Sequence, residues 1–75
     1  MSKTSKNVSE LFQELEEIVE WFSSEKVELE ESLSKYEQGL EIIQQLESKL
    51  GKIDDKLKVI HKKFKLVVNF AKFRF

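Results

Sequence analysis

The chain has 75 residues, of which 36% are charged, and it contains neither cysteine nor proline. The missing cysteines exclude a disulfide framework and a thiolate metal cluster, and the lack of an apolar run of about 20 residues excludes a membrane-spanning helix. The composition predicts an all-α protein with coiled-coil character. We expect it in the cytoplasm, because it has no cysteine and the start of the chain lacks the apolar core of a signal peptide.

The charges are distributed unevenly along the chain. Residues 1–55 carry all 14 acidic residues and a net charge of −8, whereas residues 56–75 carry +7. This asymmetry predicts either self-association of opposite ends or a basic end with its own anionic partner.

A first helix is predicted over residues 7–23, after a flexible start at residues 1–6. Asn7 is the expected N-cap, and Glu10 follows it at the position that completes a capping box. Seven apolar residues recur in steps of three and four and form one stripe: Val8, Leu11, Phe12, Leu15, Ile18, Val19 and Phe22.

A short loop at residues 23–28 is expected to lead into a long second helix over residues 29–68. Short connections usually join antiparallel helices, so we expect a helical hairpin. An apolar seam follows the second helix: Leu29, Leu33, Tyr36, Leu40, Ile43, Leu46, Leu50, Ile53, Leu57, Ile60, Phe64 and Val67. Two steps of three occur in succession at Leu40–Ile43–Leu46, which is a stammer in the repeat. Gly51 is expected to kink or weaken the helix.

The lengths of the two helices predict an oligomer. The second helix would be roughly 57 Å long and the first roughly 24 Å at 1.5 Å per residue. Folded back on the second helix, the first would cover less than half of the seam. The part from Leu50 to Val67 would therefore have to be buried against another chain.

Several segments of the two helices follow a known order and spacing. The first helix contains Phe12-Gln13-Glu14-Leu15-Glu16-Glu17-Ile18-Val19. The second helix contains Leu29-Glu30-Glu31-Ser32-Leu33, then Tyr36-Glu37-Gln38-Gly39, then Leu46 and Leu50. In these segments the chain resembles the small subunit of exodeoxyribonuclease VII, a bacterial nuclease that degrades single-stranded DNA. The resemblance covers about residues 8–60 and does not include the basic, aromatic end from Lys62 to Phe75.

The resemblance implies a single domain without an active site, several copies of which wrap around the helical region of a large catalytic subunit. That assembly would cut single-stranded DNA from either end into oligonucleotides, and this chain would reach DNA only through the complex. Gly39 would allow close approach of another helix or a large side chain. The residues expected to bind the large subunit or other copies of the chain are Leu29, Leu33, Tyr36, Gly39, Leu40, Leu50, Leu57 and Phe64.

The residues themselves indicate no catalytic, cofactor or metal site. Asp54-Asp55-Lys56 resembles a nuclease motif only superficially, because adjacent helical residues point about 100° apart and cannot converge on metal ions. His61 is the single histidine, and we expect it to flank the seam.

The basic, aromatic segment from Lys56 to Phe75, with a tail at residues 69–75, leaves three alternatives open: packing on a partner, contact with single-stranded DNA, or disorder. Trp21 could close the end of the hairpin or lie at an interface. A cytosolic coiled-coil adaptor with no link to nucleases is the alternative function.

Overall fold

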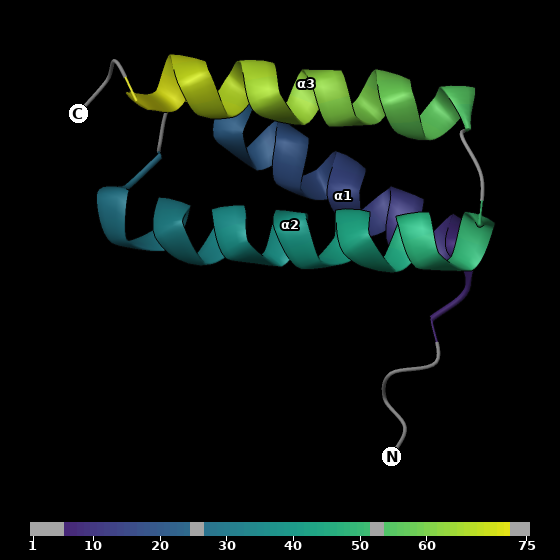
Figure 1. Cartoon of the computed structure of the whole chain (residues 1–75). Helices are drawn as coiled ribbons and strands as arrows, with labels where there is room; N and C mark the ends of the chain where they lie inside the picture. Colours follow the sequence, from purple (N-terminus) through teal and green to yellow (C-terminus); the bar gives the residue numbers. More distant parts are fainter. Residues whose placement is uncertain (1–5, 25–26, 52–53, 73–75) are drawn as a thin grey trace.

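The computed structural model describes residues 6–24, 27–51 and 54–72, and side chains as far as Ala71. These residues form three helices and no strand: α1 (Val8–Ser23), α2 (Leu29–Leu50) and α3 (Asp55–Lys72). The predicted all-α class is confirmed. α2 and α3 run in opposite directions, and α1 crosses them and packs against both (Figure 1).

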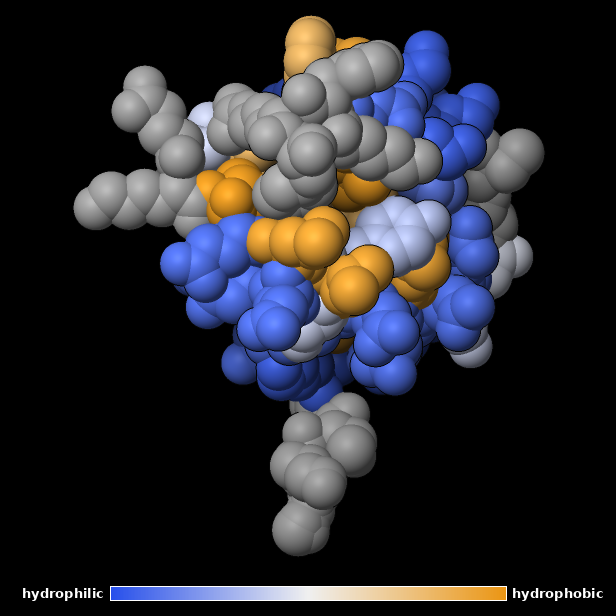
Figure 2. Space-filling view, turned by 90° about the vertical axis from the view of Figure 1, so that its left-hand side faces the viewer, coloured by the Kyte–Doolittle hydropathy of each residue, from blue (hydrophilic) through white to orange (hydrophobic). Residues whose placement is uncertain are grey.

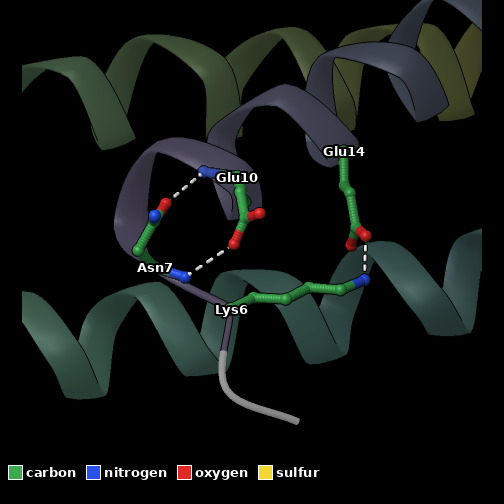
Figure 3. A network of polar contacts seen from close by, with 4 residues as sticks. All are labelled: Lys6, Asn7, Glu10 and Glu14. Atoms are coloured by element: carbon green, nitrogen blue, oxygen red, sulfur yellow. Dashed lines mark hydrogen bonds and ion pairs between the residues drawn. The ribbon is translucent and has the colours of Figure 1, made fainter. Parts of the chain in front are cut away.

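The start of α1 is held by a capping box, as the sequence predicts. The side chain of Asn7 accepts a hydrogen bond from the Glu10 backbone N–H at 2.8 Å, and the Glu10 carboxylate accepts one from the Asn7 N–H at 3.1 Å (Figure 3). Lys6 also forms an ion pair with Glu14, which lies one helical turn after Glu10. The capping box therefore gives hydrogen-bond partners to the N–H groups of Asn7 and Glu10, which the helix itself leaves unpaired.

The apolar stripe of α1 forms the centre of the core. Five of its seven members are buried (Leu11, Phe12, Leu15, Ile18 and Phe22), and the other two, Val8 and Val19, are partly buried against them. The acidic residues of α1 lie on the opposite side. Hydrophobic packing thus stabilises a helix whose glutamates repel one another.

The predicted continuous helix over residues 29–68 is wrong, because α2 ends at Leu50. Gly51 adopts a left-handed conformation with φ of 67°, and its N–H donates to the Glu47 carbonyl at 3.0 Å. Asp54 then begins α3: its carboxylate accepts a hydrogen bond from the Leu57 N–H at 3.1 Å. A left-handed glycine followed by an N-capping aspartate is a local stop and start signal. The seam residue Ile53 lies outside the described residues.

Because the chain turns after Gly51, α3 packs on α1 instead of extending away from it. Leu57, Ile60, Phe64 and Ala71 are buried, and Val67 and Val68 are partly buried. The expectation that the seam beyond Leu50 needs another chain to cover it is therefore wrong. One straight second helix would have extended beyond α1, whereas the two shorter helices α2 and α3 share the cover that α1 provides.

The segment from residue 69 to Lys72 belongs to α3, so these residues are helical and not part of a tail. The predicted tail residues Phe73, Arg74 and Phe75 lie outside the described residues.

Replacing Asn7 with alanine should lower the free energy of unfolding by about 1 kcal/mol, because an orphan N–H of α1 loses its partner. Urea denaturation followed by circular dichroism measures this change. Ser9→Ala, at an exposed position in the same turn, is the matched control. Equal stabilities of the two variants would contradict the role of the cap.

Replacing Gly51 with alanine should lower the free energy of unfolding by about 1–2 kcal/mol, because a Cβ is disfavoured at positive φ. The strain arises from the backbone alone, since no atom lies within 4 Å of the added Cβ. The matched control is Ser48→Ala, in the last turn of α2. If Gly51→Ala were as stable as the wild-type chain, the left-handed turn would not be required.

Candidate protein-binding surface

Phe64 on α3 links all three helices. Its ring lies 6.2 Å from the ring of Phe22 on α1, edge to face, and stacks on Tyr36 of α2 with centroids 5.8 Å apart and planes 8° apart. Its third neighbour is Gly39, where an added Cβ would overlap the Cε1 and Cζ atoms of the ring. The large side chain that approaches Gly39 therefore belongs to the chain itself, and not to a partner.

The apolar seam changes sides within α2. Two steps of three residues, from Leu40 to Leu46, fall about 120° short of two full turns. Before this stammer the seam faces outward, and after it Ile43 and Leu46 are buried. Four exposed apolar residues lie before the stammer or at its first position, and we name them the α2 strip: Leu29 (56% exposed), Leu33 (62%), Tyr36 (40%) and Leu40 (37%).

The α2 strip forms one wall of a groove of about 460 Å³ between α2 and α3. Phe22, Phe64 and Ala71 also line this groove, and His61, Lys65 and Asn69 contribute polar groups from α3. Figure 2 views the end of the molecule where α2 begins and shows apolar side chains gathered there with hydrophilic side chains around them. The surface is a shallow apolar patch with a polar rim, the type of surface that protein partners use.

The residues predicted to bind a partner therefore separate into two sets. Leu29, Leu33, Tyr36 and Leu40 are available on the surface as the α2 strip. The remaining four lie within the chain's own packing: Gly39, Leu57 and Phe64 are buried, and Leu50 is partly buried against the core. Whether the α2 strip binds a partner stays a prediction.

A second exposed apolar surface, not singled out from the sequence, lies on α3. Val59, Leu66 and Phe70 are 56%, 58% and 60% exposed, and we name them the α3 strip. Their spacing of seven and four residues places them on one side of the helix, opposite the buried Leu57 and Phe64. That spacing was present in the sequence, but the seam on the other side of α3 dominated the pattern.

Trp21 lies at the edge of the contact between α1 and α2. Its ring meets that of Phe22 edge to face at 5.0 Å, and the Lys35 ammonium lies 5.8 Å from its centroid. It is partly buried against the core. These contacts favour the interpretation that it closes the end of the α1–α2 pair.

The described residues offer no group suited to catalysis by a metal ion. Nowhere in residues 6–24, 27–51 and 54–72 do three or more His, Asp or Glu side chains come close enough to hold one. Asp54 caps α3 and His61 lines the apolar groove. A larger cleft between α1 and α2 is lined by uncharged residues together with charged residues of both signs, which are Glu14, Glu17, Glu41, Lys6, Lys35 and Lys49. Within the described residues, none of α1, α2 and α3 combines the length and the hydropathy that a membrane span requires.

Comparison with known proteins gives a consistent result. Residues 9–59 match the family described as "Exonuclease VII small subunit". The "Exodeoxyribonuclease 7 small subunit" of Clostridium perfringens is 35% identical over 60 residues, which are 80% of each chain. The protein of the same name from Staphylococcus epidermidis is 37% identical over 57 residues, 76% of this chain and 75% of that one. No solved structure gives a significant match.

Replacing Gly39 with alanine should lower the free energy of unfolding by about 1–3 kcal/mol, because the Phe64 ring occupies the space that the methyl group needs. The same substitution should cost much less in a Phe64→Leu background, where the ring is absent. A double-mutant cycle by urea denaturation measures this coupling. Equal costs in both backgrounds would show that the ring does not limit residue 39.

Proposed function

Because this chain belongs to the exonuclease VII small subunit family, we propose that it binds the large catalytic subunit of exodeoxyribonuclease VII through the α2 strip. The chain is a non-catalytic subunit of that nuclease. Its proposed task is to brace the helical region of the large subunit, which carries out the degradation of single-stranded DNA from both ends to oligonucleotides. This chain would meet DNA only within the complex.

The observation that carries the proposal is the exposed α2 strip. Burying a fully exposed leucine contributes about 1.5–3 kcal/mol, so four apolar side chains in one row strongly favour a partner. Their steps of four, three and four residues are those of a coiled-coil seam, which accepts the side chains of a neighbouring helix as knobs. A long helical region is the partner that this spacing fits.

The packing beneath the strip supports the same proposal. Tyr36 stacks on Phe64, and Phe64 rests against Gly39 and Phe22. The strip therefore stands on a rigid support formed by all three helices. A rigid surface loses less conformational entropy on binding than a mobile one. In this way Gly39 and Phe64 contribute to binding by holding the surface in place, without contacting the partner.

Two further features complete the proposal. The complex acts in the cytoplasm, and copies of this chain associate with one another as well as with the large subunit. A coiled-coil adaptor without a nuclease link, the alternative raised by the sequence, is not favoured, since the family match spans α1, α2 and the first turn of α3.

The test is to co-express the chain with the large subunit and purify the complex. Leu33→Glu should raise the Kd for the large subunit more than about tenfold, because a charge would be buried in the contact. The control, Gln38→Glu, changes an exposed residue about 140° from Leu33 around α2 and should leave the Kd unchanged.

Circular dichroism would establish that both variants keep the helical fold. Leu33→Glu that binds as tightly as the wild-type chain would show that the α2 strip is not the docking surface. A wild-type chain that fails to bind the large subunit would overturn the proposed function itself.

A further inference from the structure

The α3 strip has no role in the function proposed above. Val59, Leu66 and Phe70 project from the side of α3 opposite its core residues and do not line the groove beside the α2 strip. Leu66 and Phe70 also lie beyond residue 59, where the family match ends. A third surface, the exposed side of α1, is acidic and offers no comparable row of apolar side chains.

The two strips match in length and spacing. Each extends over twelve residues, and the eleven steps from first to last correspond to roughly 16 Å of helix. Leu29, Leu33 and Leu40 occupy positions zero, four and eleven of the α2 strip. Counted backwards from Phe70, the α3 strip has apolar side chains at the same three positions, Phe70, Leu66 and Val59. In this antiparallel register Lys63 lies at the level of Tyr36.

The charges beside the two strips are opposite. Successive residues of a helix are about 100° apart, and this spacing places three exposed glutamates along one edge of the α2 strip: Glu30, Glu37 and Glu41. Exposed lysines lie on both edges of the α3 strip, Lys62 on one and Lys63 on the other. An acidic edge of α2 therefore meets a lysine whichever way the two helices run. The net charges are −3 for α2 and +5 for α3, counted over their full lengths.

From this complementarity we propose that the α3 strip of one copy of the chain packs on the α2 strip of a second copy. This inference rests on the self-association proposed above and identifies the two surfaces that form it. Because the surfaces differ, the contact is heterologous: each copy has one acidic-edged and one basic-edged surface to offer. The large subunit and a second copy would then compete for the α2 strip, so that self-association and docking exclude each other at that site.

The experiment uses the full chain and measures its mass by sedimentation over a range of concentrations. Leu33→Glu disables the α2 strip, and Leu66→Glu disables the α3 strip. Each variant alone should be monomeric where the wild-type chain associates. An equimolar mixture should form a heterodimer, because one variant keeps an intact α3 strip and the other an intact α2 strip. Gln38→Glu should associate like the wild-type chain.

Two further readouts separate this contact from the proposed function. Raising the salt concentration should weaken self-association, because the edges attract by charge. Leu66→Glu should still bind the large subunit, and at least as tightly as the wild-type chain, because it no longer occupies the α2 strip of a second copy.

Three outcomes would overturn the inference. In the first, Leu66→Glu associates as well as the wild-type chain, which indicates a symmetric contact between α2 strips. In the second, the mixed variants remain monomeric. In the third, the wild-type chain is monomeric at every concentration, which also overturns self-association. None of these results would contradict the proposed binding of the large subunit, which is measured separately.

Discussion

The structure depends on the contact between the Phe64 ring and the bare backbone at Gly39. This contact brings α3 against α2, and the same ring meets Phe22 of α1 and stacks on Tyr36. A side chain larger than hydrogen at residue 39 would overlap the Phe64 ring, so that the ring or the helices that carry it would have to shift. Close packing of this kind transmits a local change widely, because a core without voids has no room to absorb an added methyl group. The surface proposed for binding stands directly on this contact.

The turn between α2 and α3 makes that contact possible. Gly51 ends one helix in a left-handed conformation, and the Asp54 carboxylate begins the next. A chain of 75 residues has little apolar surface to bury, so it gains most by packing both halves of its seam on one helix. Turning back after Leu50 allows α1 to cover α2 and α3 together. The cost of the break is small beside the burial of Leu57, Ile60, Phe64 and Ala71.

The proposed function follows from what remains exposed once this core has formed. A subunit without catalytic groups acts through its surfaces, and this chain has two apolar strips with opposite charges beside them. The α2 strip lies within the part of the chain that matches the family, whereas most of the α3 strip lies beyond it. The division is consistent with a docking surface that the family shares and a contact between copies formed by the end of the chain.

The helical class, the capping box of Asn7 and Glu10, and the stripe of α1 were predicted from the sequence alone. Each depends on residues close together in the chain, and the family resemblance depended on the same local spacing. The sequence did not determine on which side of each helix the partner would be found. Leu57 and Phe64 carry the same seam pattern as Leu29 and Leu33, yet the first pair is buried and the second exposed. That difference arises from the turn at Gly51 and from the stammer in α2, which rotates the seam toward the core. Only the tertiary structure decides which seam residues are buried, because burial depends on which helices meet. The same apolar repeat can pack on a helix of its own chain or on a helix of another chain.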